Sequence, residues 1–156
     1  MLRMETPFVV EVGPYKLQLP AFFERGSVRK KPGFAGYNTT VGDVSFALNV
    51  LDDLGRDAAE RARLVEALVT GYAPERHLVR RSTFQGIALE EHRLEETAAL
   101  GPGSVYELCL CEAYGDLLQL GFGFFQPQPK EESLRHLFLT LLAGAIVDRG
   151  YALHSR

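Results

Sequence analysis

The sequence has little of the chemistry that marks an enzyme or a membrane protein. It contains no tryptophan and only two cysteines in 156 residues. Its longest apolar run, "LFLTLLAGAIV", includes Thr140 and is far shorter than the ~18 residues that a membrane-spanning helix requires. Walker, GxSxG and HExxH patterns are absent, so no phosphate-binding loop, serine hydrolase site or zinc protease site is predicted. We therefore expect neither a membrane span nor catalysis.

An excess of positive charge is also lacking. The net charge is −3 and the isoelectric point is about 5.8, which disfavours a nucleic-acid partner. The amino-terminal sequence has no apolar stretch long enough for an export signal, so we expect a cytoplasmic protein with reduced thiols. Two local basic clusters, which we interpret as solvated surface, are Arg25, Arg29, Lys30 and Lys31, and Arg76, His77, Arg80 and Arg81.

The first half of the chain has the pattern of short strands. Length and ordinary globular composition predict a single domain over residues 1–156. "FVVEV" and "YKLQLP" predict two strands separated by Gly13, and "ERGSVRKKPG" predicts a loop. The next segment predicts a hairpin that turns near Gly42 and Asp43, with alternate residues from Val44 to Val50 on one buried face.

The second half combines helical spacing with two more strand pairs. Residues 57–72 and 131–149 have apolar residues at helical spacing, the second ending at Gly150. Residues 76–97 predict two strands that meet between Ser82 and Gly86, and residues 105–113 and 117–125 predict a hairpin. We therefore predict an α+β fold with an antiparallel sheet of about six or seven strands packed with two main helices.

The two cysteines form a CxC pair, Cys109 and Cys111, within a predicted strand. Residues two apart on a strand share a face, and their Cα atoms lie roughly 6.5–7 Å apart, at the upper limit for a disulfide. Two thiolates supply only half of a tetrahedral zinc shell, and no second Cys or His pair accompanies them. We interpret both cysteines as core packing and predict no metal and no cofactor.

The acidic segment "EEHRLEE" is the strongest candidate for acid–base chemistry. On a strand, Glu90 and His92 share one face while Glu91 and Arg93 lie on the other. We interpret the segment as structural. The alternative is a small-molecule-binding protein or an enzyme with a pocket near Glu90, His92 and Cys109.

Aromatic pairs give the only sign of a binding surface. Phe22-Phe23 and Phe124-Phe125 each place one ring on either side of the chain, which leaves one ring of a pair exposed. The last helix also has an unusually wide apolar stripe. The residues that we predict to bind a partner are Phe23, Phe124, Phe125, Leu139 and Leu142.

The order of elements, with "YKLQLPAFFERG", "DVSFALNVLDD", "FQGIALEEHRLEE" and "SVYELCLCEAYGDLLQLGFGF", resembles the PsbP-like superfamily. That group includes PsbP, a small Ran-binding protein and the bacterial DcrB-like proteins. The resemblance implies a twisted antiparallel sheet sandwiched by helices and a role in binding or assembly. Some cytoplasmic relatives are dimeric accessory chaperones of type VI secretion effectors, and none of their binding residues can be matched to this chain.

These observations predict a non-enzymatic cytoplasmic binding or adaptor protein whose partner is another protein. Its most specific form is a secretion-effector accessory chaperone that shields apolar segments and forms a homodimer, as the resemblance implies. That form requires an apolar, concave sheet face, whereas a fully charged sheet face would count against it. A structural domain of a larger assembly is a third hypothesis.

Overall fold

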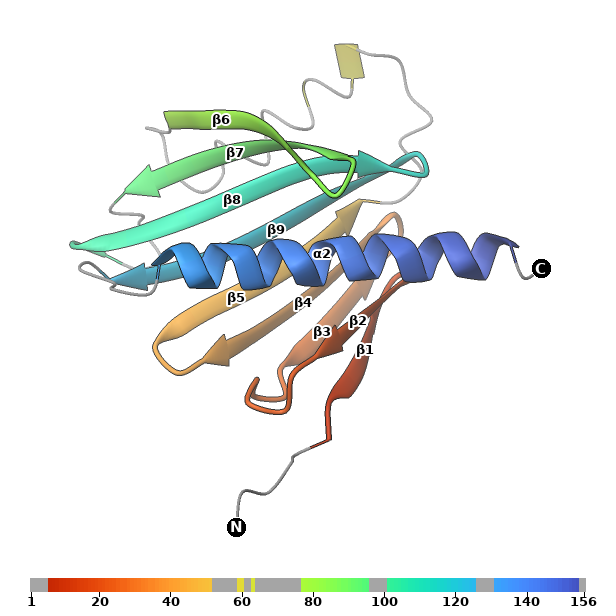
Figure 1. Cartoon of the computed structure of the whole chain (residues 1–156), viewed down its shortest axis with the longest axis horizontal. Helices are drawn as coiled ribbons and strands as arrows, with labels where there is room; N and C mark the ends of the chain where they lie inside the picture. The colour runs from red at the N-terminus through yellow and green to blue at the C-terminus, as the bar shows by residue number, and fades with distance from the viewer. Residues whose placement is uncertain are drawn as a thin grey trace.

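The computed structural model describes residues 6–51, 59–60, 63, 77–95, 101–125 and 131–154, with the backbone alone at 77–80 and 150–154. Within these ranges the chain is mostly β, with a long carboxy-terminal helix lying across a large sheet (Figure 1). The elements are β1 (Phe8–Val12), β2 (Tyr15–Leu19), β3 (Ser27–Lys31), β4 (Phe34–Val41), β5 (Val44–Leu51), β6 (His77–Phe84), β7 (Ile87–Glu95), β8 (Ser104–Ala113), β9 (Asp116–Phe125) and α2 (Glu131–His154).

The strands form two antiparallel sheets. The large sheet has seven strands in the order β3-β4-β5-β9-β8-β7-β6, and β1 pairs with β2 in a separate hairpin. β5 lies beside β9, although three strands separate them in the chain, so the middle of the sheet is made by long-range pairing. This pairing joins the two halves of the sequence into one structure.

Tight turns connect the paired strands of the large sheet. Gln85 and Gly86 have φ angles of 51° and 81°, and Tyr114 and Gly115 have φ angles of 54° and 80°. Two successive positive φ angles are typical of type I′ turns, whose twist matches that of paired strands. Gly42, with a φ of 59°, opens the β4–β5 turn. The predicted hairpins are confirmed, the β8–β9 turn lying one residue earlier than expected.

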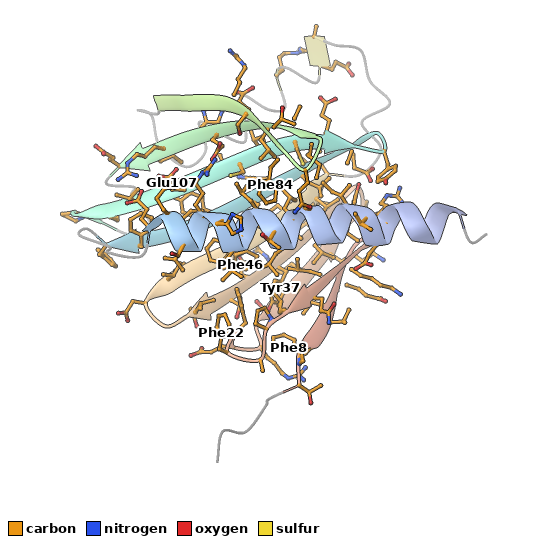
Figure 2. All side chains as sticks on the ribbon, viewed as in Figure 1. Phe8, Phe22, Tyr37, Phe46, Phe84 and Glu107 are labelled. Carbon is orange, nitrogen blue, oxygen red and sulfur yellow. The ribbon has the colours of Figure 1, made fainter. Side chains whose placement is uncertain are left out.

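The helix α2 and the β1–β2 hairpin lie on one face of the large sheet, which we call the first face. Phe138 of α2 is fully buried, and its ring centre lies 4.7 Å from that of Phe122 and 4.8 Å from that of Phe46. Figure 2 shows Phe46 and Tyr37 beneath α2. As predicted, the alternating side chains of β5 are buried here: Val44, Phe46, Leu48 and Val50.

A buried polar contact holds β2, the β8–β9 hairpin and α2 together. The Tyr15 hydroxyl donates to Asp116 Oδ2 at 2.7 Å, and Arg149 Nε donates to the same oxygen at 3.2 Å. The Arg149 guanidinium also lies over the Tyr15 ring. Burial raises the pKa of the Tyr15 hydroxyl, and the Asp116 carboxylate raises it further. Tyr15 therefore stays protonated and acts as a donor.

The opposite face of the sheet, which we call the second face, is also apolar in its middle. α2 and the β1–β2 hairpin lie on the first face and so do not contribute to the second. Strand alternation and pairing place on the second face the buried residues Ala47, His92, Leu94, Tyr106, Leu108, Leu110, Leu117 and Gln119. Apolar side chains on both faces are expected of a sheet that is covered on both sides.

The predicted fold class was wrong in its helix content. In the described part of the chain, two sheets and a single long helix replace the expected α+β arrangement with two main helices. Of the helix predicted over 57–72, residues 59, 60 and 63 are helical, and the rest lies outside the described residues. The large sheet has seven strands, within the expected six or seven, but it includes the unexpected β3, and the predicted strands β1 and β2 form a sheet of their own.

Two boundaries also differ from the predictions. Residues 24–33 were predicted to be a loop, yet they contain β3. The residues from Ser27 to Lys31 are polar or charged except for Val28, so they show no apolar alternation. An edge strand has exposed side chains and needs no alternating pattern. Gly150 was predicted to end the last helix, but α2 continues to His154. No helix among the described residues is long and apolar enough to cross a membrane.

Candidate functional site

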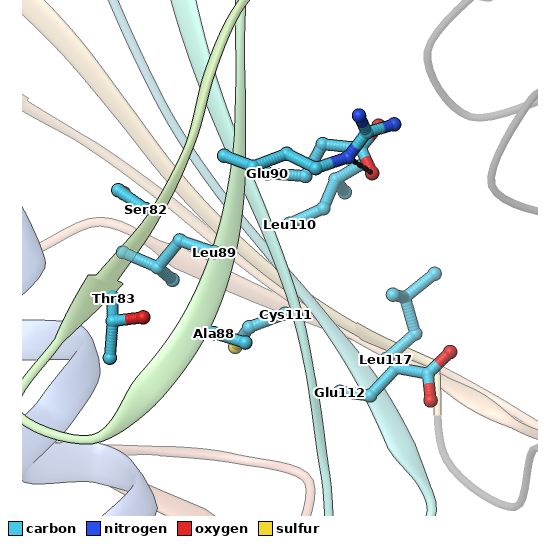
Figure 3. Close-up of a pocket in the computed structure, with 10 residues that line it drawn as sticks. Ser82, Thr83, Ala88, Leu89, Glu90, Leu110, Cys111, Glu112 and Leu117 are labelled. Carbon is cyan, nitrogen blue, oxygen red and sulfur yellow. Dashed lines mark ion pairs between the residues drawn. The ribbon is translucent and has the colours of Figure 1, made fainter.

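A groove of about 680 Å³ lies where β6, β7, β8 and β9 meet. Ala88, Leu110 and Leu117 contribute apolar surface to it, and Figure 3 shows them on neighbouring strands. Leu110 and Leu117 are buried, whereas Ala88 is exposed in the groove wall. The groove therefore opens beside the apolar middle of the second face.

The rim of the groove is charged. Arg81 and Glu112 are exposed, and Glu90 is half-buried between them and the sheet. Arg81 Nε lies 4.0 Å from Glu90 Oε2, an ion pair marked in Figure 3. An apolar floor with a charged, hydrated rim is the usual composition of a site for an apolar ligand or peptide segment.

Glu90 and His92, the predicted alternative site, lie together on the second face. His92 Nε2 is 2.8 Å from Glu90 Oε1, and the imidazole is buried. The other ring nitrogen, Nδ1, has no hydrogen-bond partner among the described residues. Cys109 does not join them, because its side chain lies on the first face. The expected Glu90–His92–Cys109 pocket is therefore only partly formed.

The cysteines lie side by side in the core. Cys109 and Cys111 are buried on the first face, which confirms that they share one face of a strand as small packing groups. Burial raises the pKa of each thiol to about 12. Since the thiolate is the reactive form, neither cysteine is a nucleophile near neutral pH. Among the described residues, no three His, Cys, Asp or Glu side chains form a group that could hold a metal ion.

A polar pair interrupts the apolar middle of the second face. Gln119 of β9 is buried and accepts a hydrogen bond from Asn49 Nδ2 at 3.4 Å. Its own amide nitrogen, Nε2, has no hydrogen-bond partner among the described residues. A buried donor without an acceptor costs about 1–3 kcal/mol. Gln119 stands in the continuous apolar run "LLQLGFGFF", and this interruption is the sequence signal from which the position could have been found.

A charged network fastens the first turns of α2 to the first face. Arg93 NH1 donates to Glu107 Oε1 at 2.6 Å and also pairs with Glu131. Arg135 donates to both oxygens of Glu91, at 2.6 and 2.7 Å. Burial raises the pKa of Glu107, and Arg93 opposes that shift. The alternation predicted for "EEHRLEE" is confirmed from Glu90 to Glu95, and the face with Glu91 and Arg93 serves to anchor the helix.

The predicted partner-binding residues are distributed between core and surface. Phe125 is 52% exposed, whereas the other four are buried within this chain: Phe23, Phe124, Leu139 and Leu142. One ring of each aromatic pair is exposed, as expected, but in the first pair it is Phe22. The four buried residues pack against other parts of the chain and are not available on its surface.

Comparisons with known proteins add little about function. No family model and no curated protein matches this chain. Among solved structures, the chain is similar to PA94 from Pseudomonas aeruginosa, described as a protein of unknown function and candidate regulator. The identity is 14%, the alignment covers 88% of this chain and 96% of that one, and the TM-score is 0.45. A similarity at this level supports no inference about fold or function.

Proposed function

We propose that this chain is a non-enzymatic cytoplasmic adaptor that binds an apolar segment of a partner protein on the second face of its sheet. The carrying observation is the distribution of apolar surface. The groove on the second face opens between apolar side chains and has the exposed Ala88 in its wall, whereas the rest of the apolar middle of that face is buried. Burial of apolar surface is the main driving force of protein association, at roughly 25 cal/mol per Å².

The resemblance to the PsbP-like superfamily supports the same proposal in a more specific form. In that form the partner is a secretion effector, and the adaptor acts as its accessory chaperone and forms a dimer. The apolar wall of the groove fits a chaperone that shields apolar segments, since a fully charged groove would repel them. The proposal that the partner is a secretion effector depends on the resemblance. It is tested separately from the proposed binding face.

One observation favours a second function, the binding of a small molecule. The groove volume of about 680 Å³ lies within the range of ligand pockets, roughly 300–1,000 Å³. The Glu90–His92 pair, 2.8 Å apart, stands next to it and could orient a polar group. In this function the ligand would occupy the groove alone and leave the rest of the second face unused.

Site-specific photo-crosslinking tests the proposal. A photoreactive amino acid at Ala88, in the groove wall, is compared with the same residue at Gln18, which is exposed on β2. After irradiation in the native host, mass spectrometry identifies the crosslinked peptides. We expect position 88 to capture an apolar segment of one partner and position 18 not to capture it. Equal capture at both positions, or only a small molecule at position 88, would contradict the proposal.

A blocking variant adds a quantitative test once a partner segment is known. Ala88→Arg places a long charged side chain in the groove and leaves the core intact, and Gln18→Arg introduces the same side chain elsewhere. We expect Ala88→Arg to weaken the affinity at least tenfold, about 1.4 kcal/mol, and Gln18→Arg to leave it unchanged. Calorimetric titration with the purified segment measures both.

A further inference from the structure

The edge strand β3 is chemically unlike the rest of the molecule. All five of its residues, Ser27–Lys31, are exposed, and three of them in succession are cations: Arg29, Lys30 and Lys31. The strand carries no acidic residue, although the whole chain has a net charge of −3. These three cations make no ion pair with any described residue. Their charge is therefore not neutralised by any part of the chain that the structure describes.

The backbone of β3 is also available on one side. β3 is the outermost strand of the large sheet and pairs only with β4 (Figure 1). Its pairing runs without a register shift from Ser27 opposite Asn38 to Lys31 opposite Phe34. Such an edge presents a regular row of unpaired N–H and C=O groups to which a further strand can be added.

The opposite edge of the sheet differs in both respects. β6 has a register shift between Leu78 and Arg80, and such a bulge disrupts the ladder and blunts an edge. Its exposed cation Arg81 lies close to Glu90. An irregular edge whose cation is paired is protected against further strands. β3 instead combines a regular ladder with unpaired cations.

We propose that β3 is a docking edge for an extended, acidic segment of a partner protein, which adds to the large sheet as an eighth, antiparallel or parallel strand. The register of β3 with β4 places Arg29 and Lys31 on the second face and Val28 and Lys30 on the first. An added strand therefore meets cations on both of its faces. A segment with acidic residues at successive positions and an apolar residue near Val28, which is 49% exposed, fits this edge best.

This edge is separate from the groove on the second face. β3 and the groove-lining strands β6 and β7 lie at opposite ends of the seven-stranded order. The docking edge therefore does not rest on the function proposed for the groove. Lysines on an edge strand also prevent uncontrolled pairing between sheets, and the experiment must distinguish that role from selective binding.

Peptide titration with the intact protein makes this distinction. The probe is a fluorescent ten-residue peptide with three successive acidic residues, Asp or Glu, and Thr and Val at the other positions. A control peptide has the same charge but carries Pro at alternate positions, so that it cannot donate hydrogen bonds to a strand. We expect the first peptide to bind and to protect the amides of Ser27–Lys31 from hydrogen exchange, with affinity that falls as salt rises. The Pro peptide should bind at least tenfold more weakly.

Charge variants identify the surface. Lys30→Glu combined with Lys31→Glu should lower the affinity about tenfold or more, because two attractive contacts become repulsive. Arg81→Glu combined with Arg63→Glu changes the net charge equally at exposed positions, with Arg81 on β6 at the opposite edge of the large sheet, and should have little effect. Ala88→Arg, which blocks the groove, should also leave this binding unchanged, so that failure of the groove proposal and failure of this one are distinguishable.

Three results would overturn the docking edge. Absence of binding would leave the lysines as protection of the edge. Equal binding of the Pro peptide would show attraction by charge without strand addition. Binding to vesicles of anionic phospholipid, with no binding of either peptide, would assign the cations to a membrane surface.

Discussion

Replacement of Phe138 by alanine should remove a large part of the stability of this chain. Phe138 is fully buried between α2 and the sheet, with ring centres of Phe122, Phe46 and Phe23 at 4.7, 4.8 and 6.0 Å. Truncation of a buried phenylalanine costs about 3–5 kcal/mol, because transfer energy is lost and a cavity remains. Domains of ordinary stability unfold with about 5–15 kcal/mol, so the variant should lose at least a fifth of that free energy.

Phe125→Ala is the matched control, since Phe125 is 52% exposed and the chemical change is identical. Its cost should be below about 1 kcal/mol, as is usual for exposed positions. Urea unfolding followed by circular dichroism measures both, and Phe138→Leu supplies a milder variant if the alanine variant does not fold. Equal shifts of the unfolding midpoint for Phe138→Ala and Phe125→Ala would refute the packing of α2 on the first face.

Three further predictions concern the buried polar and thiol groups. Because burial raises the pKa of Glu107 above its ordinary 4.5, the folded state binds this proton more tightly than the unfolded state. The stability that this group contributes is present at and below its ordinary pKa and is lost as pH rises through the raised value. Over that pH range the free energy of unfolding should fall less for Glu107→Gln than for the unaltered chain. An equal dependence on pH for both would contradict the raised pKa of Glu107. The thiols of Cys109 and Cys111, with pKa values of about 12, should react with iodoacetamide near pH 7.5 only after unfolding; rapid labelling of the native protein would show that they are accessible thiolates. Asp116→Asn should lower the free energy of unfolding by about 1–3 kcal/mol because it removes the charge that Arg149 faces, and the loss should shrink in Arg149→Met, as a double-mutant cycle by urea unfolding would measure.

The local pattern of the sequence predicted most strands of the large sheet. Alternation from Val44 to Val50 and glycine at Gly42, Gly86 and Gly115 are consequences of neighbouring residues, and the structure confirms them. β3 was missed because an edge strand in contact with water needs neither alternation nor apolar residues. The pairing of β5 with β9 also leaves no local pattern, because it joins residues far apart in the chain, from Ser45 with Gly123 to Leu51 with Leu117.

The candidate site was less accessible to sequence reasoning. Four predicted contact residues were chosen for their hydrophobicity, and that same property places them in the core where α2 packs on the sheet. Phe22 rather than Phe23 is exposed, because the direction of each ring depends on the turn before β3 and not on residue type. Glu90 and His92 were identified correctly as neighbours on one face, since that follows from strand alternation alone.

Methyl NMR of the complex tests the central claim most directly. The protein is labelled at leucine methyl groups and mixed with the apolar segment captured at position 88, and nuclear Overhauser effects between the two are recorded. The account predicts contacts from the segment to the methyl groups of Leu110 and Leu117 on the second face. Contacts confined to Leu139 and Leu142 of α2 would place the partner on the first face and contradict it.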